Sequence, residues 1–307
     1  MLSEVSPSNT GQPSDAGQSG AARPRQGLLP RDSRRSRWWI DVLVIVWLCW
    51  LYDLIANLAP VRQKQALAHA SSILHLERVL HLDPEAALNH WLAGHHTLAV
   101  WLSNYYDNAH FVVTLGVLGW IWLRAPLDVY RPLRNNLILI NVIGMVVFWM
   151  YPTAPPRLYD PAGFSDVVAS THAFGSWHSG TLGGVANQFA AMPSLHISWA
   201  MWSALAIWRL AGTGRWRVTV WLYPLLTALA VMATANHYLL DVVAGAATFA
   251  VATALADGSL RWSETRRNRR ASLTVSSLAV PALALDTDDV HPVGMSRSSA
   301  TGVDLSA

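Results

Sequence analysis

Two histidines begin two separate apolar segments of the chain. His196 ends the sequence Met192-Pro-Ser-Leu-His, and His237 lies in Asn236-His-Tyr-Leu-Leu-Asp241. Asp241 follows His237 by four residues, so in a helix both side chains share one face within hydrogen-bond reach. The carboxylate can hold the ring in one tautomer and stabilise its protonated form, leaving the other ring nitrogen to attack phosphorus. We therefore predict His237 as a nucleophile, Asp241 as the group that orients it, and His196 as a general acid and base.

An arginine that follows two prolines is the predicted phosphate ligand. Arg157 ends the sequence Tyr151-Pro-Thr-Ala-Pro-Pro-Arg, in which the fixed proline angles restrict the path of the backbone. A guanidinium held there could bind phosphate oxygens through two parallel hydrogen bonds. Pro193 suits the first position of a helix, whose free amides near Ser194 and Leu195 would favour an anion. The Ser194 hydroxyl would add another donor to this predicted oxyanion site.

The composition is typical of a membrane protein. Of the 307 residues, 52% are hydrophobic, only 13% are charged, and 16 are tryptophan, which is unusual for a soluble domain. Residues 1–37 and 259–307 are instead rich in polar and charged residues, so we predict disordered cytoplasmic tails around a membrane domain at 38–258. The net charge of +3 is small and the arginines cluster beside apolar segments. This pattern argues against a nucleic-acid partner.

Neither a metal nor a cofactor is predicted. Cys49 is the only cysteine, which excludes a disulfide within the chain and a cysteine metal site. Other histidines are expected on the same side of the membrane as the site, but their spacing matches no compact ligand pattern: His90, His95, His96, His110, His172 and His178.

The apolar pattern predicts an all-α fold, a polytopic bundle of six transmembrane helices. A span needs about 20 mainly apolar residues, and the expected spans are 38–59, 109–123, 137–152, 192–211, 218–235 and 238–256. Arginines cluster before the first span and after the second, fourth and sixth, so these segments and both termini should be cytoplasmic. The segments that carry Arg157, His196 and His237 then meet at the extracytoplasmic face.

Residues 60–104 are predicted to form an extracytoplasmic cap of amphipathic and interfacial helices. The segment 61–82 should be amphipathic, with one apolar side and with polar residues elsewhere; the apolar side comprises Ala66, Ile73, Leu76, Val79 and Leu80, and the polar residues include Lys64, Glu77 and Arg78. The apolar segment 88–103 contains three histidines. If it crossed the membrane, the two arginine-rich tails would lie on opposite sides, so we predict an interfacial or re-entrant helix.

The three motifs resemble those of the type-2 phosphatidic acid phosphatase superfamily, in particular its branch related to inositol phosphorylceramide synthases. That branch has similar Pro-Pro-Arg, Met-Pro-Ser-Leu-His and Asn-His-Tyr-Leu-Leu-Asp sequences, and the resemblance covers residues 38–256. It implies a six-helix membrane enzyme that works without metal. It also implies a phosphohistidine on His237, general acid catalysis by His196 and phosphate binding by Arg157.

The chain departs from the superfamily pattern in one place and imitates it in another. The usual Ser-Arg pair before the nucleophilic histidine is replaced by Ala230 and Val231, so another group must supply that interaction; Asn236, Ser194 and His110 are candidates. Arg124, followed by Arg131 and Pro132, imitates the first superfamily motif. The predicted topology places that imitation on the cytoplasmic face, about 30 Å from the histidines, so we interpret it as a positive-inside loop.

The sequence therefore predicts an integral membrane phosphatase or phosphotransferase that acts on a lipid-linked phosphate. Water is the default acceptor, whereas the branch resemblance favours transfer of a phospho-polyol head group to a lipid hydroxyl. A third alternative, from another class, is a non-enzymatic protein that binds or transports lipids.

Overall fold

The computed structural model describes residues 62–160, 163–171 and 189–284, together with single positions between 39 and 54. From residue 62 onward these belong to one compact unit, Ile45–Ala307. The described parts contain helices and a single isolated bridge between Thr153 and Ala190. The predicted all-α class is thus confirmed for this part of the chain. Most of the first predicted span, both tails beyond these bounds, Cys49, His172 and His178 lie outside the described residues.

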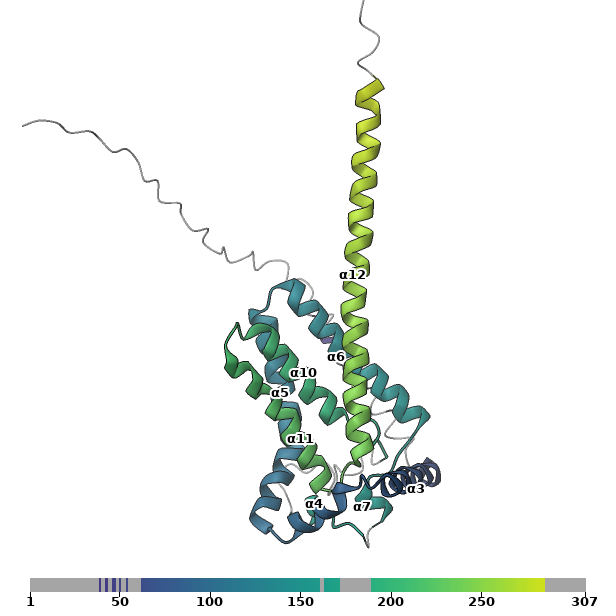
Figure 1. Ribbon diagram of the computed structural model, residues 1–307, viewed down its shortest axis with the longest axis vertical. Coiled ribbons are helices and arrows are strands. Elements are labelled where there is room, and N and C mark those ends of the chain that lie inside the picture. The colour runs from purple at the N-terminus through teal and green to yellow at the C-terminus, as the bar shows by residue number, and fades with distance from the viewer. Residues whose placement is uncertain are drawn as a thin grey trace, which may run out of the picture. The chain divides into compact units, whose positions relative to one another are not determined.

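The helices form a bundle around α10 (Leu195–Leu210), which contacts α5 (His96–Arg124), α6 (Leu127–Met150), α11 (Leu222–Ala233) and α12 (Leu239–Ala284). The 3₁₀ helix η2 (Arg215–Trp221) leads directly into α11. The outer helices α3 (Gln63–Leu80) and α4 (Pro84–Ala93), with the short α7 (Pro156–Tyr159), gather at the end of the bundle where α12 begins (Figure 1). The four-residue helix α8 (Val167–Ser170) contacts α4 and α5.

Among the described residues, three helical segments are long and apolar enough to cross a membrane: Leu127–Met150, Arg215–Ala233 and Leu239–Ser259. Helix α5 has 29 residues, and α10 has 16, which correspond to lengths of about 44 Å and 24 Å. These findings support an integral membrane protein. The count of six spans stays a prediction.

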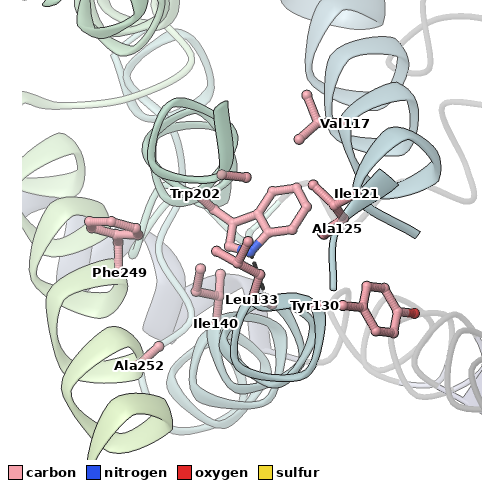
Figure 2. Close-up of a cluster of buried hydrophobic side chains, with 10 residues drawn as sticks. Val117, Ile121, Ala125, Tyr130, Leu133, Ile140, Trp202, Phe249 and Ala252 are labelled. Atoms are coloured by element: carbon pink, nitrogen blue, oxygen red, sulfur yellow. Dashed lines mark hydrogen bonds between the residues drawn. The ribbon is translucent and has the colours of Figure 1, made fainter. Parts of the chain in front are cut away.

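The core of the bundle is built around Trp202 of α10 (Figure 2). Its indole is fully buried, and Nε1 donates a hydrogen bond to the Leu133 carbonyl of α6 at 2.8 Å. A buried indole N–H needs such a partner. Ile121 of α5 and Phe249 of α12 pack into the same cluster, so four helices contribute side chains to this part of the core.

Several boundaries differ from those predicted. The segment 88–103 is not one interfacial helix: the chain turns at Gly94 and His95, and α5 then runs without a break from His96 to Arg124. Helix α6 begins at Leu127, so Arg131 and Arg134 lie within a helix instead of a loop. The predicted boundary at residue 258 lies inside α12, which continues to Ala284. Polar positions continue a helix readily when they form its exposed face, so hydropathy alone marks these ends poorly.

The predicted apolar side of the first cap helix is buried only in part. In α3 the buried residues are Ala66, Ala70, Ile73, Leu74 and Glu77, whereas Leu76, Val79 and Leu80 are exposed. The buried face is therefore rotated toward Glu77, whose carboxylate accepts a hydrogen bond from the start of α12. A specific polar partner has outweighed the simple apolar periodicity.

Candidate active site

Four helix termini meet at one end of the bundle. Successive helices run in opposite directions, so the end of α6, the start of α10, the end of α11 and the start of α12 lie at the same end. The segments after α6 and before α10 are joined by backbone hydrogen bonds, from Thr153 N to Phe189 O at 2.8 Å and from Ala191 N to Thr153 O at 3.2 Å. The sequence motifs of Arg157, His196 and His237 are thereby brought together.

His237 is buried, with only 4% of its surface exposed. Its Nδ1 lies 2.8 Å from the carbonyl oxygen of Ala191 and 3.6 Å from Oδ2 of Asp241. A carbonyl can only accept, so Nδ1 must carry the hydrogen, and Nε2 of a neutral ring is then the nitrogen with a lone pair. The tautomer is set by Ala191 more than by Asp241, which differs from the arrangement expected from the sequence.

Asp241 is fully buried, and its Oδ2 accepts a hydrogen bond from Tyr238 N at 2.9 Å. Tyr238 directly precedes the first residue of α12, so the carboxylate satisfies an amide that has no partner within the helix. The same oxygen lies 3.6 Å from Nδ1 of His237, so one carboxylate oxygen meets both the start of α12 and the imidazole.

His196 lies in the first turn of α10, and its ring centroid is 5.5 Å from that of His237. On its other sides it stacks on Tyr106, at 4.6 Å, and meets His110 edge-on, at 4.3 Å. Pro193 is not the first residue of this helix, as the sequence had suggested: Ser194 is the N-cap, and the Met192–Pro193 peptide bond is cis. The geometry places two imidazoles side by side at the junction of two helices.

Arg157 is buried and is fixed to the segment that precedes His237. Its amide donates to the Ala235 carbonyl at 3.1 Å, and its Nε donates to Oδ1 of Asn236 at 2.8 Å. Nη1 lies 3.4 Å from Oδ2 of Asp166. Ala235 has a φ of 53°, a left-handed conformation that is costly for alanine and is often found at functional sites.

Asn236 and Ser194, the other predicted phosphate ligands, differ in their surroundings. The Asn236 amide nitrogen donates to Thr234 O and Oγ1 at 3.2 and 3.0 Å, so both ends of its side chain have protein partners. Ser194 Oγ is buried and has no hydrogen-bond partner within the described residues. The Ser194 amide donates to Asp241 O at 3.0 Å, which ties the start of α10 to the first turn of α12.

Some neighbours of the site are not evident from the sequence. Asp166 contacts Arg157, and Tyr106 contacts His196. His110, which the sequence analysis named as a candidate, also contacts His196. Tyr106 and His110 lie four residues apart, and the helical spacing could have shown their common face. Nothing in the sequence links that face to His196.

The segment from Arg124 to Pro132, which imitates the first superfamily motif, lies away from the site. Arg124 ends α5, and Arg131 lies in the second turn of α6. The site is beyond the other end of α6, and a rise of 1.5 Å per residue separates Arg131 from Tyr151 by about 30 Å. No group of three or more potential metal ligands is found among the residues that the structure describes.

A cavity of about 470 Å³ adjoins the site. It lies between α3, α6 and α12, and its lining is mainly apolar, with Ile73, Leu76, Val147, Met192 and Leu240 among the residues. Met192 lies two residues before Ser194, and Leu240 directly precedes Asp241. An apolar compartment therefore borders a cluster of polar groups.

Residues 71–255 match the family model described as the PAP2 superfamily. The chain belongs to the PAP2 superfamily. Comparison with curated proteins and with solved structures finds no match. PAP2 proteins are typically phosphatases and phosphotransferases, so membership supports an enzyme that acts on lipid phosphates. The matched range contains all three PAP2-like motifs and ends within α12.

Proposed function

We propose that this protein is an integral membrane phosphatase or phosphotransferase that acts on a lipid-linked phosphate through a phosphohistidine on His237. The observation that carries the proposal is the convergence of Arg157, His196 and His237. The rings of His196 and His237 have centroids 5.5 Å apart. Arg157 is hydrogen-bonded to Asn236, which directly precedes His237.

In the first step, Nε2 of His237 attacks phosphorus, and the bond from phosphorus to the lipid oxygen breaks. His196 donates a proton to the departing alkoxide. In the second step, His196 removes a proton from water or an alcohol, whose oxygen attacks phosphorus and breaks the bond between phosphorus and nitrogen. Arg157 and Ser194 would bind the phosphoryl oxygens, and the charge of Asp241 would stabilise the modified ring. No metal is needed in this sequence of steps.

Asn236 acts in the proposed mechanism mainly through Arg157. With its oxygen on the guanidinium and its nitrogen on Thr234, its contribution to phosphate binding is to fix the arginine that makes the contact. The superfamily has an arginine at the position of Val231. In this chain Ser194 and His110 would supply its interaction with phosphate, and His110 lies against His196.

The apolar cavity favours a substrate with a hydrocarbon part. Its lining and its position beside Met192 and Leu240 suit a lipid chain whose phosphate reaches the histidines. We further propose six spans, a cap at residues 60–104, cytoplasmic termini and an extracytoplasmic site, as the arginine distribution predicts.

The test uses the full chain purified in detergent with phosphatidic acid, an isoprenyl pyrophosphate or a phosphoinositide. Released phosphate and transferred head groups are followed with and without polyol acceptors, which separates hydrolysis from the transfer expected of the inositol phosphorylceramide synthase branch. We expect His237→Ala to abolish turnover and His196→Ala to slow it by at least about 100-fold. Full activity in His237→Ala would remove the nucleophile from the proposal, and an inert parent protein would favour lipid binding or transport.

A further inference from the structure

A buried carboxylic acid in the outer helices contacts the first turn of α12. Glu77 of α3 and Glu85 of α4 are both fully buried, although glutamate is rarely found there without a partner. Oε1 of Glu77 accepts a hydrogen bond from the amide of Leu240 at 2.6 Å, across 163 residues of sequence. Leu240 lies between His237 and Asp241, so this bond reaches the centre of the motif.

The hydrogen bond from Leu240 to Glu77 gives an acceptor to an amide in the first turn of α12. The first amides of a helix have no acceptor within that helix and, when buried, need another one. At the start of α12, Asp241 satisfies the amide of Tyr238, and Glu77 satisfies that of Leu240. Asp241 belongs to α12 itself, whereas Glu77 belongs to α3.

The groups that face Glu77 indicate its protonation state. Glu85 and Asp83 approach from the side of α4, Asp241 and Tyr238 from the start of α12, and Tyr159 faces Tyr238 from α7. Burial, the hydrogen bond with Glu85 and the negative charges of Glu85 and Asp241 raise the pKa of Glu77 to about 9. Burial also raises the pKa of Glu85. At neutral pH Glu77 is therefore a neutral acid, and its Oε1 accepts the hydrogen bond from Leu240.

We propose that Glu77 is a positioning residue: through its hydrogen bond with Leu240 it holds the first turn of α12 and thereby sets the positions of His237 and Asp241. The effect on turnover rests on the proposed function, whereas the effect on the helix does not. The outer helices then influence catalysis indirectly, by positioning α12, and do not touch the substrate.

The decisive comparison is between Glu77→Gln, Glu77→Leu and Glu77→Asp. Glutamine is a neutral isostere with an acceptor for Leu240, so at neutral pH it should keep parental kcat and unfold at or above the parental temperature. Leucine has a similar volume but no acceptor, and aspartate is one methylene too short. Both should lower kcat by about tenfold or more with a smaller change in KM, because the histidines shift while most of the cavity lining lies outside α12. Lys64→Gln, at an exposed position of α3, is the matched control and should behave like the parent.

Each outcome either supports or overturns the proposal that Glu77 positions α12. The proposal is overturned if Glu77→Leu and Glu77→Asp match the parent in both kcat and unfolding temperature, or if Glu77→Gln loses as much as Glu77→Leu. If Glu77→Leu does not fold, the comparison of glutamine with aspartate gives the answer. If the parent is inert on every lipid phosphate, the proposed function fails, and the unfolding temperatures of the same variants still test whether Glu77 holds α12.

Discussion

Asn236 Oδ1 accepts a hydrogen bond from Arg157 Nε at 2.8 Å, and both side chains are buried. The Asn236 amide nitrogen is in turn fixed by Thr234, so the guanidinium is oriented by the turn that leads into His237. A planar donor used in this way loses little freedom when it binds an oxyanion. The residue before the proposed nucleophile thereby aligns the proposed phosphate ligand.

Asn236→Ala should consequently lower kcat/KM by about 100-fold, because a displacement of about 1 Å in a positioning group has that effect. Hydrolysis of phosphatidic acid in detergent measures it. Asn141→Ala removes an asparagine whose side chain bonds within α6, to Leu137 O, and should leave activity unchanged. Equal activities of the two variants would contradict the role of Asn236.

Asp241→Asn should separate the two roles of that carboxylate. Asparagine can still accept from Tyr238 N, so the unfolding temperature should stay near that of the parent. Its lack of charge should lower kcat by about 10- to 100-fold, less than the ~10⁴-fold loss caused by replacing a triad aspartate, because Ala191 holds the His237 tautomer here. Asp241→Ala should lose both stability and activity. A larger loss in Asp241→Asn would show that the carboxylate sets the tautomer.

Gly245→Ala should disrupt the contact between α12 and the start of α10. A Cβ on Gly245 would overlap the Ser194 carbonyl oxygen, and backbone at that position cannot move without carrying His196 with it. We expect a loss of about 1–3 kcal/mol in the free energy of unfolding, together with reduced turnover. Gly258→Ala in the same helix meets nothing within 4 Å and should be neutral or stabilising by up to about 1 kcal/mol. Thermal unfolding of the two variants, with phosphate release, makes the comparison.

The raised pKa of Glu77 predicts how stability changes with pH. Its ordinary value is 4.5, and in the folded protein burial raises it to about 9. Between these values the folded state binds a proton that the unfolded state has lost, so the stability from this group is full below pH about 4.5 and falls as the pH rises toward 9. Glu77→Gln should flatten this part of the curve. Denaturant unfolding at several pH values tests it, and identical slopes in parent and variant would refute it.

The sequence determined the helical class and the membrane setting, and it supplied the residues of the proposed site. Long apolar segments with tryptophans at their ends leave few alternatives to membrane helices. Helical spacing was enough to pair His237 with Asp241, and the three motifs were enough to indicate the superfamily that the family model then matched. Each of these inferences depends on neighbours in sequence or on bulk composition.

Tertiary structure decided which partner each polar group meets. No spacing rule connects Ala191 to His237, Asp166 to Arg157 or Glu77 to Leu240. It also rotated α3 so that a glutamate is buried while Leu76 and Val79 are exposed. The reason is physical: the hydrophobic pattern reports the average surroundings of a helix face, whereas a buried amide or imidazole requires one particular acceptor, and which residue supplies it depends on how distant helices pack.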